Sequence, residues 1–211
     1  MTAPAPVPDI LPAALAGRLI HDVMGHLSGI MSGLDLLNDP TAQAMHDDAL
    51  ALATASVRSL HDDMAYSRML YGAGAGAMDI RTLEVAAQSL FTGRRATLDW
   101  SAGVGTISAI AGRTLLGFVR LAAEALFAGG VATVTTRAAP SGLVVRVEAA
   151  GPRARLPDEA LIGLAGRPFD GGLAGKWAPA FYLWTTATAH GGAVSATKTD
   201  GGVTLEARFP A

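Results

Sequence analysis

The chain has 211 residues, of which 50% are hydrophobic and 16% charged, with a formal net charge of −2 and no cysteine. This length suits one large domain or two small ones, and the hydrophobic content excludes disorder over most of the chain. The near-neutral charge, with no block of Lys or Arg, argues against a nucleic-acid or polybasic membrane partner. The lack of cysteine excludes disulfides, thiolate zinc sites and a cysteine nucleophile.

The mean hydropathy of +0.34 raises the question of a membrane segment. The longest apolar stretches are interrupted by Arg113, Arg120 and Glu124, and Ala and Gly supply much of their hydropathy, so none reads as a membrane span. Residues 1–8 are rich in Pro and Ala and show no signal-peptide pattern, so we expect a short disordered lead there. We therefore expect a soluble protein located in the cytoplasm.

Two long helices are predicted at the start of the chain, over residues 10–37 and 41–71. The first ends at the strong helix break Asn38-Asp39-Pro40, and the second keeps an apolar stripe at spacings of three and four residues. Helices of this length joined by so short a turn must pack antiparallel. Because a single hairpin cannot cover its apolar faces, we expect it to dimerise into a four-helix bundle.

The first helix places a histidine away from its apolar residues. At the helical period, one broad arc gathers the apolar side chains, which are Leu19, Ile20, Val23, Leu27, Ile30, Met31, Leu34 and Leu37. His21 points roughly opposite the centre of this arc, among the small residues Gly25 and Ser28. Such an imidazole is accessible to a macromolecular partner, as a phospho-accepting histidine requires, and the adjacent Asp22 can orient the ring. The alternative is a solvated surface histidine without a function.

The second half of the chain changes to mixed helices and strands. Residues 72–77 look like a linker, and Asp79 is a plausible N-cap. The predicted helices are 80–90, 107–127, 157–164 and 178–189, and the predicted strands are 95–100, 131–137, 143–148, 193–198 and 203–209. We therefore predict an α+β protein: a helical hairpin domain over 1–72, then an α/β sandwich over 73–211 with an antiparallel-rich sheet and helices on one face.

A long hairpin with an exposed His-Asp pair, followed by this order of elements, resembles a sensor histidine kinase core. It resembles more closely the ChpT-type histidine phosphotransferases of alphaproteobacterial phosphorelays. The most specific segments are Arg18-Leu-Ile-His21-Asp22, Ser32-Gly-Leu-Asp-Leu-Leu37, Asp39-Pro40 and Asp47-Asp48-Ala49. The resemblance implies that His21 carries the phosphoryl group, that the hairpin dimerises, and that the C-terminal domain is a kinase-like ATPase fold that no longer binds nucleotide.

Three nucleotide-binding elements of kinases can be sought in the second half, and none is found. Glu124 stands where the Asn that holds Mg²⁺ is expected, and Ala149 where an Asp reads the adenine amino group. The bulky segment Trp177-Ala178-Pro179-Ala180 replaces the flexible glycine lid. We therefore expect no ATP binding.

The resemblance implies a phosphorelay transfer between receiver domains, one of them in a hybrid histidine kinase and the others in response regulators. A neutral nitrogen of His21 attacks an aspartyl phosphate, and Asp22 accepts a hydrogen bond from the other ring nitrogen. Gly25 and Ser28 permit close approach, Met24 offers an apolar contact, and Arg18 is expected to pair with receiver carboxylates or phosphoryl oxygens. No cofactor is expected in this chain, because the receiver supplies Mg²⁺.

Other interpretations stay open. Because Gly25 has no hydroxyl or amide to place a hydrolytic water, phosphatase activity on a partner's aspartyl phosphate should be weak. His26 is expected to have a packing role rather than a catalytic one. His61 and His46 are less favoured carriers, and His190 reads as structural. The alternative functions are a divergent autophosphorylating kinase and a non-catalytic dimeric adaptor of response regulators.

Overall fold

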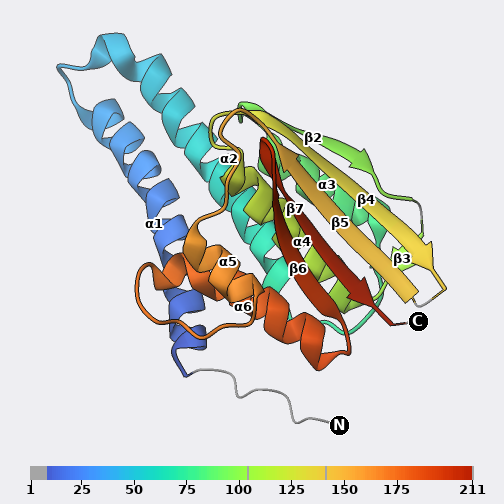
Figure 1. Cartoon of the computed structure of the whole chain (residues 1–211). Helices are drawn as coiled ribbons and strands as arrows, with labels where there is room; N and C mark the ends of the chain where they lie inside the picture. Colours follow the sequence, from blue (N-terminus) through green and yellow to red (C-terminus); the bar gives the residue numbers. More distant parts are fainter. Residues whose placement is uncertain (1–8, 104, 141, 211) are drawn as a thin grey trace.

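The computed structural model describes residues 9–103, 105–140 and 142–210; the lead expected over residues 1–8 lies outside them. Two long helices, α1 (Ile10–Asn38) and α2 (His46–Tyr71), run antiparallel to each other and project beyond the rest of the chain (Figure 1). Between them, the Asp39 carboxylate accepts hydrogen bonds from the backbone N–H and the hydroxyl of Thr41, at 2.8 and 2.7 Å. This turn and the short 3-10 helix η1 (Gln43–Met45) delay the start of α2 to His46, five residues later than expected.

Small residues let α1 and α2 approach closely. Gly33 is buried, and a Cβ placed there would lie 2.7 Å from the carbonyl oxygen of Ala49 and 2.9 Å from the Cβ of Ala53. One turn earlier, a Cβ on Gly29 would collide with the side chain of Ser56. Larger side chains at these glycines would force the two helices apart.

The apolar arc of α1 divides into two halves in the structure. Leu19, Val23, Ile30 and Leu37 are half-buried within the chain. Exposed apolar residues form a second row, which we call the α1 stripe: Ile20, Met24, Leu27, Met31 and Leu34. Nothing in the described part of this single chain covers the α1 stripe, which is unusual for five large apolar side chains in one row.

The C-terminal part holds a five-stranded sheet in the order β2-β4-β5-β7-β6. These strands are β2 (Ala96–Ser101), β4 (Gly130–Ala139), β5 (Gly142–Ala150), β6 (Ala193–Thr199) and β7 (Gly202–Phe209). The β2–β4 pair is parallel and the other three pairs are antiparallel. A separate small ladder joins β1 (Met78–Asp79) to β3 (Thr106–Ile107). The predicted α+β class and antiparallel-rich sheet are confirmed.

Helices α3 (Ile80–Phe91), α4 (Ala109–Ala125) and α6 (Ala174–Ala189) cover one face of the sheet, and the short α5 (Asp158–Leu164) packs on α6 (Figure 1). The Asp79 side chain caps α3 by accepting from the N–H of Thr82 at 2.9 Å, as predicted. Two further predicted boundaries, besides the start of α2, are wrong. Helix α4 starts only after Ser108 because residues 106–107 pair as β3, and α6 starts four residues before the expected Ala178.

One hydrophobic core joins the two halves of the chain. Tyr66 and Leu70, at the end of α2, are buried with the residues of α3, α4 and the inner face of the sheet. At the other end, Leu11 of α1 is buried against Trp177 and Phe181 of α6. None of the helices in the described ranges is both long and apolar enough to cross a membrane.

Trp177 is the largest fully buried side chain at the contact between α1 and α6. It stacks on Phe181 with ring centroids 4.5 Å apart, and its indole N–H donates to the carbonyl of Arg167 at 2.9 Å. We predict that Trp177→Ala lowers the free energy of unfolding by about 3–5 kcal/mol, because it leaves a cavity and an unpaired carbonyl. Chemical denaturation measures this loss, and a change under about 1 kcal/mol would show that Trp177 does not hold α1 to α6.

Candidate functional site

His21 lies on the exposed side of α1, and 84% of its side chain is accessible. Its Nδ1 atom is 3.3 Å from Oδ1 of Asp22. Three of the expected contact residues share this side of the helix, since Met24, Gly25 and Ser28 are all exposed. A Cβ on Gly25 would meet open space, and the Ser28 hydroxyl folds back onto the carbonyl of Met24 at 2.9 Å. The imidazole is therefore open to a partner molecule.

Asp22 points the opposite way, into the junction between α1 and α4. Only 16% of its side chain is exposed. Its carboxylate accepts from Nε of Arg18 at 3.0 Å and from Nη2 of Arg120 at 3.1 Å. Burial alone would raise the pKa of Asp22, but the charge and hydrogen bond of Arg18, with smaller contributions from His21 and Arg120, hold that pKa below its usual value. Asp22 is thus a fixed carboxylate beside a free imidazole.

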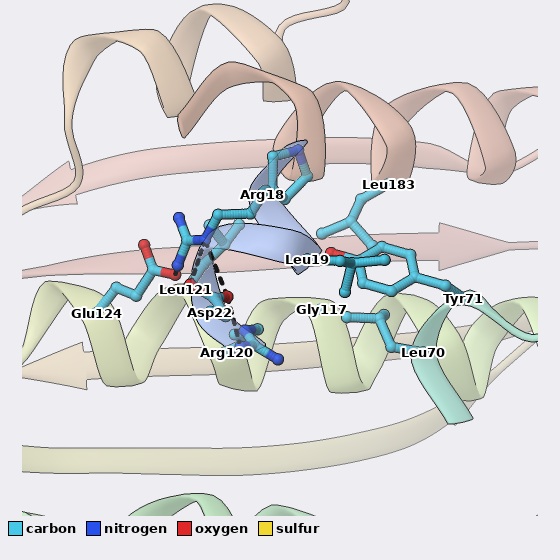
Figure 2. Close-up of a pocket in the computed structure, with 11 residues that line it drawn as sticks. Arg18, Leu19, Asp22, Leu70, Tyr71, Gly117, Arg120, Leu121, Glu124 and Leu183 are labelled. Carbon is cyan, nitrogen blue, oxygen red and sulfur yellow. Dashed lines mark hydrogen bonds and ion pairs between the residues drawn. The ribbon is translucent and has the colours of Figure 1, made fainter. Parts of the chain in front are cut away.

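Arg18 takes part in an ion-pair network that ties α1 to α4 and α6. Its Nη2 atom is 2.8 Å from Oε1 of Glu124, and Oε2 of Glu124 is 3.1 Å from Nζ of Lys176. Figure 2 shows Arg18, Asp22, Arg120 and Glu124 converging from α1 and α4. In this single chain the guanidinium of Arg18 is engaged by Asp22 and Glu124, and its expected pairing with a receiver domain stays a prediction.

Arg18 also satisfies a carbonyl that a proline leaves open. Pro179 lies inside α6 and has no N–H to donate to the carbonyl of Gly175, four residues earlier. Nη1 of Arg18 is 3.4 Å from that carbonyl oxygen. The proline in α6 therefore creates an acceptor that α1 uses when it docks.

Arg120 extends the network to α2. The same Nη2 atom that meets Asp22 is 3.5 Å from Oδ1 of Asp63, whose other oxygen is 2.9 Å from Nε2 of His26. The guanidinium carbon of Arg120 lies 5.8 Å from the ring centroid of Tyr66, and the Tyr66 hydroxyl donates to a backbone carbonyl of α4 at 2.5 Å. His26 is thus held by a carboxylate across the hairpin.

A hollow of about 320 Å³ opens beside His21, between α1, α4, α6 and the turn after α3. Four cationic and three carboxylate side chains line it, together with His21, Gly25 and His26; the charged residues are Arg18, Arg94, Arg120, Lys176, Asp22, Asp63 and Glu124. The exposed imidazole therefore stands at the edge of a charged recess built by both halves of the chain.

A family model described as the histidine phosphotransferase C-terminal domain matches residues 80–202. The chain belongs to this histidine phosphotransferase family. Family membership places the phosphotransferase in two-component signalling, where phosphorelay partners include response regulators. A comparison with curated proteins finds no match.

One solved structure shares the fold of this chain. A bacterial phosphotransferase is 20% identical and superposes with a TM-score of 0.85, over 98% of this chain and 100% of that one. The histidine kinase AdeS of Acinetobacter baumannii is 11% identical, with a TM-score of 0.49 over 91% and 94% of the two chains. The blue-light activated histidine kinase of Erythrobacter litoralis is 14% identical, with the same TM-score over 89% and 95%.

The positions expected to have lost nucleotide-binding groups have structural roles in this phosphotransferase. Glu124 bridges Arg18 and Lys176, Ala149 is buried in the sheet, and Trp177 and Ala178 are buried against α1. A second, much smaller cavity of about 10 Å³, close to the size of one water molecule, lies between α1, α2, α4 and α6. Leu19, Gly117 and Leu183 line it (Figure 2).

The other histidines of the phosphotransferase differ from His21. His61 lies 3.1 Å from Asp62 on the exposed side of α2, with 80% of its side chain accessible. Nδ1 of His190 is 2.8 Å from the carbonyl of Thr186, next to Gly191, whose φ of +73° ends α6.

Within the described ranges, no group of three or more His, Asp or Glu side chains is placed to hold a metal ion.

The lowered pKa of Asp22 predicts a pH-dependent contribution to stability. A carboxylate with a folded pKa below its unfolded value stabilises the fold at pH values above the unfolded pKa, near 3.9, and this contribution is lost as the pH falls through the folded pKa. We therefore expect the free energy of unfolding to fall more steeply below about pH 4 in the wild type than in Asp22→Asn. If the free energy of unfolding changes with pH by the same amount in both proteins between about pH 3 and 7, the prediction is wrong.

Proposed function

We propose that this chain carries a phosphoryl group on His21 between receiver-domain aspartates, without binding ATP. The observation that supports it best is an 84% exposed imidazole paired to an anchored carboxylate, in a chain of the histidine phosphotransferase family. His21 is the phosphoryl carrier and Asp22 orients it. Gly25 and Ser28 form the surface around His21 that meets the receiver, and Met24, at the border of this surface, belongs to the α1 stripe. We assign Arg18 to holding Asp22, because its guanidinium contacts that carboxylate.

The chemistry requires a lone pair on the outer ring nitrogen. With Nδ1–H donated to Asp22, the neutral Nε2 attacks the phosphorus of an aspartyl phosphate. The bond from phosphorus to the aspartate oxygen breaks, and the electron pair leaves with that carboxylate. The phosphorylated ring keeps its Nδ1 proton and a positive charge, which Asp22 faces. A second receiver's aspartate then attacks the phosphorus and returns His21 to its neutral state. Mg²⁺ is supplied by the receiver.

We further propose that two chains pair through the α1 stripe. Five exposed apolar side chains in one row are covered when a second copy packs against them, giving a four-helix bundle. Residues 1–72 then form the dimerisation and phosphotransfer domain, and residues 73–211 the kinase-like domain. The core that crosses residue 72 through Tyr66 and Leu70 fixes the orientation of the second domain on the first.

The proposal predicts that the chain has no useful affinity for ATP. Arg18 and Leu19 of α1 lie against α4 and α6, where they line a cavity of only about 10 Å³, and Glu124 presents a negative charge with both oxygens engaged. In calorimetric titration with MgATP we expect a Kd above about 1 mM, a binding free energy weaker than about −4 kcal/mol. Micromolar binding, or labelling of His21 by ATP, would instead support a divergent kinase.

The function is tested by a relay between two purified receiver domains. The first is labelled on its aspartate, freed of its kinase and mixed with this chain, and the second is added afterwards. We expect acid-labile label on this chain, followed by its passage to the second receiver. If both receivers bind the chain but neither exchanges label with it, the chain is an adaptor.

A further inference from the structure

A carboxylate beside a nucleophilic imidazole has two opposed effects. It orients the ring by accepting from one nitrogen, and its negative charge favours the protonated imidazolium. An imidazolium has no lone pair on Nε2 and cannot attack phosphorus. A carrier histidine paired with an acidic residue therefore gains if the hydrogen bond is kept and the charge is offset.

The structure supplies that offset at His21. Two guanidinium groups contact the Asp22 carboxylate, from Arg18 one turn earlier on α1 and from Arg120 on α4. The charged groups that face this region from every neighbouring element are Arg18 and Asp22 of α1, Asp63 of α2, Arg94 after α3, Arg120 and Glu124 of α4 and Lys176 of α6. Four cations thus surround three carboxylates, and Glu124 is taken up by Arg18 and Lys176.

Arg120 reaches Asp22 from α4, whereas Arg18 lies on the same helix as Asp22. It is 98 residues away from Asp22 in sequence, its side chain is only 14% exposed, and its position is set by Tyr66 and by Asp63 of α2. A buried guanidinium with these partners has little freedom to leave the Asp22 carboxylate. The second domain therefore reaches the oriented pair through one side chain.

The same chain holds an internal comparison. His61 and Asp62 on α2 repeat the His-Asp dipeptide with a similar Nδ1 to Oδ1 distance of 3.1 Å. In the described residues, Asp62 has no ion pair with Arg or Lys, and 54% of its side chain is exposed. The pair at His21 differs by its two guanidinium partners.

We propose that Arg120 is a positioning residue for phosphoryl transfer through His21. It fixes the Asp22 carboxylate and offsets its negative charge, so that Asp22 orients the imidazole while Nε2 keeps its lone pair. This rests on the proposed function of His21. It gives the kinase-like domain a part in the transfer step itself, in addition to any contact that it makes with a receiver.

Phosphoramidate, a small donor that phosphorylates imidazoles, tests this without a receiver. The rate of phosphohistidine formation is followed by ³¹P NMR across pH for the wild type, Arg120→Met, Arg120→Lys, Asp22→Asn and the double variant Asp22→Asn/Arg120→Met. We expect Arg120→Met to be about 3- to 10-fold slower near pH 7, with the acidic limb of its rate profile moved to higher pH. Arg120→Lys, which keeps the charge, should restore the position of that limb.

Coupling separates positioning from general stability. If Arg120 acts through Asp22, adding Arg120→Met to Asp22→Asn should slow the reaction by less than about 2-fold. Arg146→Met, on the opposite face of the sheet, is the matched control and should leave the profile unchanged. In ¹⁵N spectra of the ring nitrogens, the signals of His21 should change in Arg120→Met and those of His61 should not. Should Arg120→Met fail to fold, Arg120→Gln carries the same test.

The possible results separate the two proposals. Wild-type rates and pH profiles in the folded Arg120→Met or Arg120→Gln variants would overturn the role of Arg120 and leave the function of His21 intact. Equal slowing in the Asp22→Asn background would also overturn it, because the effect would not pass through Asp22. If a phosphorylated receiver phosphorylates His21→Ala as fast as the wild type, the proposed function of His21 is wrong.

Discussion

Replacing His21 by Ala is expected to abolish acid-labile phosphorylation of this chain by a phosphorylated receiver, a loss of at least about 1,000-fold in rate. The imidazole is the nucleophile in the proposed step, and alanine offers no lone pair to replace it. Because 84% of the side chain is exposed, the free energy of unfolding should change by less than about 0.5 kcal/mol. Transfer is measured by label that survives neutral gel electrophoresis and is lost in acid.

The matched controls are the two other exposed histidines that precede an aspartate in the sequence, His61 and His46. His61→Ala and His46→Ala should transfer at wild-type rates. His61 has the same neighbour in the sequence but lies outside the charged recess that surrounds His21. Full transfer in His21→Ala together with loss in His61→Ala would move the carrier to α2. Wild-type function in a cell carrying His21→Ala would favour the adaptor.

Replacing Met31 by Glu is expected to convert the proposed dimer into monomers. Met31 is 62% exposed within the α1 stripe, so a carboxylate there costs little in a single chain. In a two-fold dimer it places two charges in one apolar interface. We expect about 3 kcal/mol of destabilisation, which raises the dimer Kd about 100-fold, as measured by sedimentation equilibrium.

Val85→Glu is the matched control for this substitution. Val85 on α3 is equally exposed, at 62%, and lies outside the α1 stripe. It should leave the dimer intact. A wild-type chain that sediments as a monomer at all concentrations would contradict the dimer, and equal dissociation in both variants would place the interface elsewhere.

Most of the fold could be predicted from local patterns. The period of the apolar residues, the break at Asn38-Asp39-Pro40 and the cap at Asp79 were sufficient to place helices and strands within a few residues of their positions. The exceptions arise from contacts between segments that are far apart in the sequence. The last helix was predicted to begin at Ala178, but α6 begins at Ala174 and accommodates Pro179, because Arg18 lies near the carbonyl that this proline leaves open. Residues 106–107 extend into β3 because β1, more than 25 residues earlier, pairs with them.

The site was predicted only in part. An exposed His21 follows from helical periodicity, because its neighbours on that side are small. The partners of Asp22 do not follow, because Arg120 and Glu124 lie about 100 residues away and meet α1 only in the folded chain. The available signal was a pair of charged residues, Arg120 and Glu124, four residues apart in a largely apolar helix. Such charges in a buried helix need partners, and α1 provides them.

The measurement that tests the central claim most directly is the position of the phosphoryl group. The wild-type chain is phosphorylated by a labelled receiver, digested at neutral pH and mapped by mass spectrometry with electron-transfer fragmentation. We predict a single phosphorylated residue, His21, with its acid-labile group disappearing when a second receiver is added. A phosphoryl group on His61, His46 or any other residue, with His21 unmodified, would contradict the account.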